Sequence, residues 1–98
     1  MIPPLSVEHT ANDHKGIFSI RREGKRLAEM TYSVAGTDKI IIDHTQVSDE
    51  LRGTGAGFSL VEAAVAWARK MGYAIIPLCP FAKATLQKHP EWQDVLAK

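Results

Sequence analysis

The sequence predicts one α+β domain, with an antiparallel meander of strands, a glycine-rich turn, a long helix, a further strand and one or two short helices. Three observations support this fold class. The chain has 98 residues, which is enough for one hydrophobic core but not for two. Alternating apolar residues dominate its first half, and an apolar pattern of helical period follows the glycines of its second half. We therefore expect residues 1–98 to form a single domain.

The first half of the chain consists of strand patterns separated by turns. Residues 1–15 show no clear period and are interpreted as a leading strand fragment or a loose arm. Residues 17–22 and 27–34 predict a hairpin. One face of its second strand is expected to carry Ala28, Met30, Tyr32 and Val34. Residues 39–47 predict the next strand, and its unbroken run Ile40, Ile41 and Ile42 favours a central position covered on both faces.

The second half of the chain contains the helical patterns. A long amphipathic helix is expected to run through Met71 and to end at Gly72. Its apolar residues, at three- and four-residue spacing, are Leu60, Val61, Ala64, Val65, Ala68 and Met71. Residues 73–78 predict a buried strand that loses its partner near Pro77. Residues 81–88 and 91–96 predict short helices, each with a proline suited to the first helical position. Trp67 and Trp92 are expected to be packing residues.

Composition and charge argue against several classes of protein. Hydrophobic residues make up 45% and charged residues 23% of the chain, as in soluble globular proteins. The net charge is +1 and the basic residues are scattered, so nucleic acid is not an expected partner. No segment resembles a signal peptide or a bilayer span, so we expect a cytoplasmic protein without a membrane partner. The single cysteine and the isolated histidines His9 and His14 predict neither a disulfide nor a metal site.

A glycine-rich turn lies between a predicted strand and the long helix. It consists of Arg52, Gly53, Thr54, Gly55, Ala56 and Gly57. Glycines allow close approach of the backbone to a ligand, and N–H groups at the positive end of a helix favour an anion such as a phosphate. A P-loop would need Lys followed by Ser or Thr, and a dinucleotide fingerprint would need a glycine where Phe58 stands. The alternative is that the glycines serve only a tight junction between strand and helix.

The spacing of Arg52, Gly55 and Gly57 resembles the pyrophosphate loop of the GNAT superfamily of acetyltransferases. Three further segments, 44–47, 77–81 and 89–92, extend the resemblance to a minimal GNAT-like family of about this length, from about Phe18 to Leu96. The resemblance implies the GNAT acyl-CoA N-acyltransferase fold, whose sheet is mixed, mostly antiparallel, and splayed between its central strands. Acetyl-CoA would be the cosubstrate, with its pantetheine arm in the gap and its pyrophosphate at the helix start.

The resemblance also implies which residues contact the cosubstrate. The backbone of Gln46 and Val47 would pair with the pantetheine arm and receive the acetyl carbonyl. The pyrophosphate would be held by the glycine-rich turn, that is, by Arg52, Gly53, Thr54, Gly55, Ala56 and Gly57. Pro80 and Lys83 are further candidates for contact with CoA, Lys83 through a phosphate group, although Lys83 also fits a solvated lysine.

Cys79 and His44 are the candidate catalytic residues. If Cys79 caps a helix that begins at Pro80, the helix dipole favours its thiolate, which is the form that attacks a thioester. Regular alternation would place Ile40, Ile42, His44 and Gln46 on one face of their strand. His44 would then act as a general base toward an incoming ammonium or toward Cys79. The alternatives are an inert buried cysteine and a histidine that only packs.

The leading hypothesis is an N-acetyltransferase that acts on an amine, which could belong to a small molecule or to a protein Lys. The amine would attack acetyl-CoA directly or receive the group from acetylated Cys79. The competing hypotheses are a CoA-binding sensor or interaction module without catalysis, and a phosphate-binding fold that takes a nucleotide. Larger GNAT proteins have N-terminal helices that wall the acceptor site, so we expect an acceptor site that is open or completed by another molecule. A monomer or weak dimer is expected.

Overall fold

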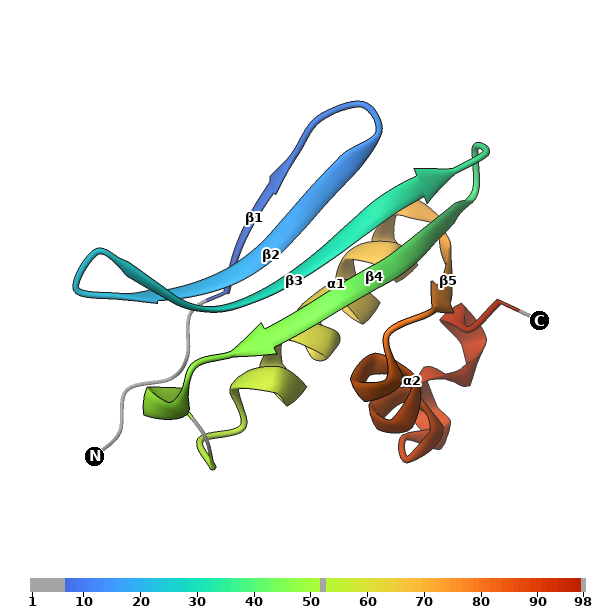
Figure 1. Cartoon of the computed structure of the whole chain (residues 1–98). Coiled ribbons are helices and arrows are strands. Elements are labelled where there is room, and N and C mark those ends of the chain that lie inside the picture. Colours follow the sequence, from blue (N-terminus) through green and yellow to red (C-terminus); the bar gives the residue numbers. More distant parts are fainter. Residues whose placement is uncertain (1–6, 52, 98) are drawn as a thin grey trace.

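A five-stranded sheet in the order β1-β2-β3-β4-β5 forms the framework of the chain. The computed structural model describes residues 7–51 and 53–97. Strands β1 (Val7–Ala11), β2 (Lys15–Arg22), β3 (Lys25–Ala35) and β4 (Lys39–Val47) are antiparallel neighbours, and β5 (Ala74–Pro77) runs parallel to β4 (Figure 1). The α+β class and the mixed, mostly antiparallel sheet are confirmed. Of the two interpretations of residues 1–15, the strand is correct for Val7–Ala11, and residues 1–6 lie outside the described residues.

Helix α1 (Ala56–Met71) covers one face of the sheet, and Figure 1 shows the opposite face without a helix in front of it. The predicted apolar stripe of α1 is buried at Leu60, Val61, Ala64, Val65 and Ala68. Met71 is 53% exposed, contrary to expectation, because it lies in the last turn of the helix. Within the described ranges, no helix has the length and apolar character needed to cross a bilayer.

Two short helical segments follow β5 and pack on the same side of the sheet as α1. They are α2 (Pro80–Gln87) and the 3-10 helix η2 (Pro90–Val95), with prolines at their first positions as predicted. Trp92 of η2 is buried and its ring lies 5.3 Å from that of Phe58 in α1. Arg69 of α1 forms a bidentate pair with Asp94, with contacts of 2.9 and 2.7 Å. These contacts fix the C-terminal segments against α1.

The core lies between α1 and one face of the sheet. Ile40 and Ile42 of β4 are fully buried there, whereas Ile41 between them is only half-buried. The expectation that β4 is covered on both faces is therefore wrong for the face of Ile41. The physical reason is that α1, α2 and η2 all pack on the other side.

Strand β4 contains a bulge at Asp43. On β3, Thr31 pairs with His44 and Tyr32 pairs with Ile42, so Asp43 is an extra residue without a partner on β3. Because side chains alternate with a period of two, one inserted residue exchanges the faces of every residue that follows it. The bulge therefore changes which residues of β4 point toward α1.

Beyond the bulge, Thr45 and Val47 pair with Met30 and Ala28, whose side chains lie in the core. His44 and Gln46 pair with Thr31 and Glu29, which belong to the helix-free face. The predicted shared face of Ile40, Ile42, His44 and Gln46 is wrong after Ile42. Regular alternation could not anticipate the inserted residue.

An aromatic cluster attaches β1 to the sheet and to α1. The His9 ring stacks on Phe18 at 4.2 Å, and its Nε2 lies 2.6 Å from the hydroxyl oxygen of Tyr32. The edge of Trp67 approaches the same imidazole at 4.8 Å, so Trp67 packs as predicted. Burial lowers the pKa of His9, which favours the neutral imidazole. His9 is thus a structural residue, a role that the sequence did not indicate.

We expect Gly16→Ala to destabilise the protein, because the Tyr32 ring lies across Gly16 on the neighbouring strand. A Cβ at Gly16 would stand 2.2 Å from the ring and hydroxyl of this buried tyrosine. Overpacking of this kind costs about 1–3 kcal/mol. Urea unfolding measures the change, with Lys15→Ala as the control, because Lys15 is the exposed neighbour of Gly16 at the start of β2. Equal stability of Gly16→Ala and the wild type would contradict this packing.

Candidate functional site

Strands β4 and β5 separate at Ile42. Their parallel pairing runs from Lys39 with Ala74 to Ile42 with Pro77 and extends no further in the described chain. The N–H groups of Leu78 and Cys79 both donate to the carbonyl of Ile42, each at 3.1 Å. Beyond this point β4 continues to Val47, while the chain after Pro77 turns into α2. The predicted splay is present, but it lies between β4 and the edge strand β5 and not between two central strands. Pro77 ends its strand as predicted.

The glycine turn places the start of α1 near the end of β4. Gly53 and Gly55 have φ values of +77° and +82°, which favour glycine. Gly55 is the N-cap of α1, and the first turn of that helix has no acidic side chain. Its N–H groups and the positive end of the helix dipole are therefore available to an anion. Arg52, predicted to belong to this loop, lies outside the described residues.

A hollow of about 260 Å³ connects the open part of β4 with this helix start. It is lined by Val47, Leu51, Gly53, Gly55, Ala56, Gly57, Phe58 and Phe81. A Cβ at Gly57 would lie 2.4 Å from the ring of Phe81, so α1 and α2 approach this closely only because residue 57 is a glycine. The hollow brings together most of the glycine turn with Val47, as the sequence predicted, and adds Leu51, Phe58 and Phe81.

Cys79 lies where the two strands part, as the N-cap of α2 with Pro80 in the first helical position. Both placements agree with the prediction. The side chain is 6% exposed, and its Sγ lies 3.3 Å from Oγ1 of Thr45 on β4. Burial acts to raise the pKa of Cys79. Hydrogen bonding by the Thr45 hydroxyl and by backbone groups at Ala82, Phe81 and Thr45 outweighs burial and lowers this pKa.

The bulge separates the other candidate residues of β4. His44 and Gln46 are exposed on the helix-free face, whereas Thr45 points toward α1 and contacts Cys79. Thr45 therefore occupies the position beside the thiol that His44 would need in order to act as its base. Sequence reasoning missed Thr45, because only the bulge brings it there and no residue pattern marks a bulge.

The two remaining candidates lie on α2. Pro80 begins the helix next to Cys79. Lys83 lines a different hollow, with Pro77, Gln87, Leu96 and Ala97, so the structure does not bring it to the glycine turn. In the part of the chain that the structure describes, no three His, Cys, Asp or Glu side chains are grouped as metal ligands.

Comparisons with known proteins agree with this geometry. The family model of the GCN5-related N-acetyl-transferases matches residues 17–95. An NMR structure of a GCN5-like protein from Staphylococcus aureus is 43% identical with a TM-score of 0.71, and the match covers 92% of this chain and 87% of that one. No curated protein matches the chain.

Two more distant structures show the fold alone. The ribosomal-protein-S18-alanine N-acetyltransferase from Escherichia coli is 19% identical with a TM-score of 0.67, over 80% of this chain and 53% of that one. An aminoglycoside N-acetyltransferase solved in complex with CoA is 14% identical with a TM-score of 0.58, over 89% of this chain and 62% of that one. The family match over residues 17–95 and the 43% identity to the Staphylococcus aureus protein show that the chain belongs to the GCN5-related N-acetyltransferase family and confirm the predicted enzyme class, an acetyltransferase.

Proposed function

We propose that this protein transfers an acetyl group from acetyl-CoA to an amine. One observation carries the proposal: the part of β4 that has separated from β5 leads directly to the start of α1. Val47 at the end of β4 and Gly53, Gly55 and Gly57 line the same hollow. A single ligand with an amide-containing arm and a pyrophosphate would satisfy both features. CoA has this chemistry.

The two ends of the proposed site suit the two parts of CoA. The edge of a strand binds extended amide chains through backbone hydrogen bonds, as an added strand does. The pantetheine arm would pair in this way with β4 near Gln46 and Val47. The pyrophosphate would accept hydrogen bonds from the first N–H groups of α1, which no acidic side chain of that turn opposes. The CoA complex of the distant aminoglycoside enzyme supports this use of the fold.

The acetyl group would then lie near the point where β4 leaves β5, beside Cys79. In the direct route, the amine attacks the thioester carbon, the C–S bond to CoA breaks, and CoA leaves as a thiolate. The proton lost by the amine goes to His44 or to water. His44 suits this role better than that of a base for Cys79, because it lies on the helix-free face, away from Thr45 and the thiol.

A Cys79-linked route is supported by a different observation, the lowered pKa of that thiol at the head of α2. The Cys79 thiolate would attack the thioester carbon and form a new C–S bond while the bond to CoA breaks. The amine would then attack acetyl-Cys79, lose its proton to His44 or to water, and return the cysteine as a thiolate.

Release of free CoA thiol from acetyl-CoA, measured with a panel of amines and Lys peptides, tests the proposed activity. We expect release that depends on the amine, and thermal stabilisation by CoA and acetyl-CoA. Stabilisation without turnover on any amine would indicate a binding module instead. Stabilisation by ATP and not by CoA would overturn the assignment of the ligand.

We expect Gly57→Ala to weaken CoA binding while the fold remains intact. The added methyl group would displace the ring of Phe81, which is 43% exposed and free to move into the hollow. Isothermal titration calorimetry should show a loss of about tenfold or more in affinity, roughly 1.4 kcal/mol or above. Gly36→Ala is the control, since Gly36 lies in the turn before β4 and not in the hollow. Unchanged CoA affinity in Gly57→Ala would argue against this site.

Incubation with acetyl-CoA should produce an acetyl adduct on Cys79 if the covalent route operates. Mass spectrometry of the intact protein and its peptides detects the adduct, and Cys79→Ala should lack it and lose most turnover. Full turnover in Cys79→Ala, with no adduct in the wild type, would eliminate this route and leave direct attack.

The alkylation rate of Cys79 should rise with pH through a midpoint below that of an ordinary thiol, because its pKa is lowered and the thiolate is the reactive form. Thr45→Val removes a hydrogen bond that favours the thiolate, so the midpoint should move to higher pH. Iodoacetamide kinetics across a pH series measure both midpoints. Thr31→Val, on the opposite face of the sheet, should leave the midpoint unchanged. A shift as large in this control as in Thr45→Val would count against the contact.

A further inference from the structure

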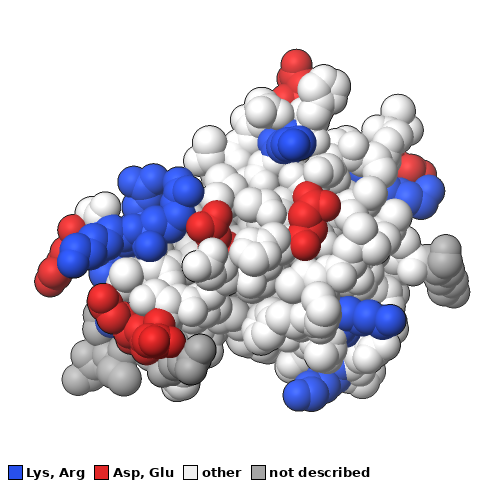
Figure 2. Space-filling model, in the orientation of Figure 1, with Lys and Arg blue, Asp and Glu red and all other residues white. Residues whose placement is uncertain are grey.

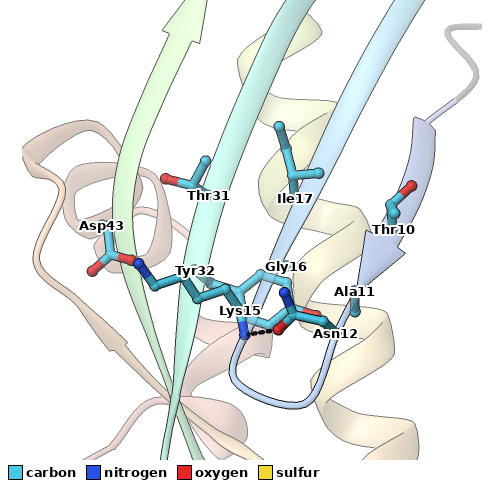
Figure 3. A pocket seen from close by; sticks show the side chains of 9 residues that line it. All are labelled: Thr10, Ala11, Asn12, Lys15, Gly16, Ile17, Thr31, Tyr32 and Asp43. Carbon is cyan, nitrogen blue, oxygen red and sulfur yellow. Dashed lines mark hydrogen bonds between the residues drawn. The ribbon is translucent and has the colours of Figure 1, made fainter.

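The helix-free face of the sheet contains a second hollow, which the binding of CoA does not use. Its volume is about 460 Å³. Side chains of the β1–β2 hairpin line one side of it, and residues of β3 and β4 line the other (Figure 3). The lining residues that matter below are Lys15, Thr31 and Asp43.

Asp43 is turned to this face by the bulge in β4. The hydroxyl of Ser33 on β3 donates to Oδ2 of Asp43 at 2.9 Å, which holds the carboxylate in place. Asp43 is exposed, and it forms no ion pair with any residue that the structure describes. A carboxylate accepts several hydrogen bonds, so Asp43 retains acceptor capacity for a ligand.

The position of Asp43 connects this hollow with the proposed reaction centre. It is the first residue of β4 beyond the last pair with β5, and it directly precedes His44. Thr45, two residues further, contacts Cys79 from the other face. If the acetyl group lies where the strands part, a ligand at Asp43 reaches it from the side opposite α1.

Charge on this face favours a cation at Asp43. Figure 2 shows the face with acidic side chains near its middle and basic side chains gathered over the turn between β2 and β3. Glu29 and Asp43 are the acidic residues of strands β2 to β5, and only Asp43 lines the hollow. Lys15, the first residue of β2, enters the same hollow, and Figure 3 shows its side chain extending toward Asp43.

We propose that this hollow binds the acetyl acceptor, with the acceptor's primary ammonium at Asp43 and an anionic group of the acceptor at Lys15. The acceptor is thus an amine that also bears a carboxylate, and not a diamine, whose second cation Lys15 would repel. This inference rests on the proposed function. The opposite faces of the sheet then hold the two reactants: CoA binds beside α1 and α2, and the amine binds on the helix-free side.

Steady-state kinetics with Nα-acetyl-lysine and its neutral amide test the assignment, because the two acceptors differ only in the carboxylate. Asp43→Asn should lower kcat/KM for both by about tenfold or more, chiefly through KM, as loss of a binding contact does. Glu29→Gln is the matched control, a carboxylate of the same face outside the hollow, and should behave as the wild type. Equal kinetics in Asp43→Asn and Glu29→Gln would overturn the role of Asp43.

The Lys15→Gln variant tests the role of the Lys15 ammonium separately from that of the Asp43 carboxylate. It should lower kcat/KM for Nα-acetyl-lysine and leave or raise that for the amide, since Lys15 attracts the carboxylate but competes for Asp43. The wild type should accordingly prefer Nα-acetyl-lysine to its amide. A wild type that does not distinguish them, or a variant that affects both equally, would overturn the role of Lys15.

A binding measurement keeps this inference distinct from the proposed function. ¹⁵N-labelled protein saturated with CoA is titrated with Nα-acetyl-lysine, and amide shifts are expected at Thr31 and Asp43 and not in the Asp43→Asn variant. Such shifts without turnover would refute the transferase proposal and support the amine site. Turnover on amines, with shifts confined to other residues, would refute the amine site and support the transferase.

Discussion

The separation of β4 from β5 is the constraint on which the rest of the site depends. Pro77 has no N–H to donate, so the ladder cannot continue through it, and the next two N–H groups both turn to the carbonyl of Ile42. Where β4 loses the edge strand β5, its backbone groups are left to pair with water or with another partner. In the proposed function, a ligand that pairs as a strand would fill this place, and the helix start at Gly55 would hold its charged end.

The bulge at Asp43 has its effect only because it lies next to this separation. It turns Thr45 toward the thiol of Cys79 and leaves His44 on the opposite face. The N-cap position, the first N–H groups of α2 and the Thr45 hydroxyl then act together on the thiol. Two local irregularities thus act together. Pro77 at the end of β5 leaves the edge of β4 open, and the extra residue Asp43 in β4 shapes the environment of Cys79.

Much of the fold could be predicted from residue patterns. The strand 39–47, the buried stripe of α1 and the two prolines that begin short helices follow from period and local chemistry. The glycine turn was placed correctly with Val47, and the position of Cys79 followed from its proline neighbour. These features depend on residues close together in the chain.

The features that were predicted wrongly or missed from the sequence depend on contacts between distant parts of the chain. The faces on which His44 and Gln46 lie depend on the pairing register between β4 and β3. The exposure of Ile41 depends on which face of the sheet the helices cover. Lys83 follows Cys79 by one helical turn, yet the direction of α2 carries it to another hollow. The contacts of His9 with Phe18, Tyr32 and Trp67 join three distant segments. Each of these features is determined by the packing of distant segments, and no local residue pattern predicts it.

The inserted residue of β4 also bears on how such a site can change through evolution. Substitutions at His44, Thr45 or Gln46 alter one side chain at a time and keep each on its present face. Loss of the single codon for Asp43 would restore regular alternation and move all three across the sheet together. The presence of one extra residue in β4 therefore determines which side chains face the thiol and which face solvent. The identity of the neighbouring residues does not determine it.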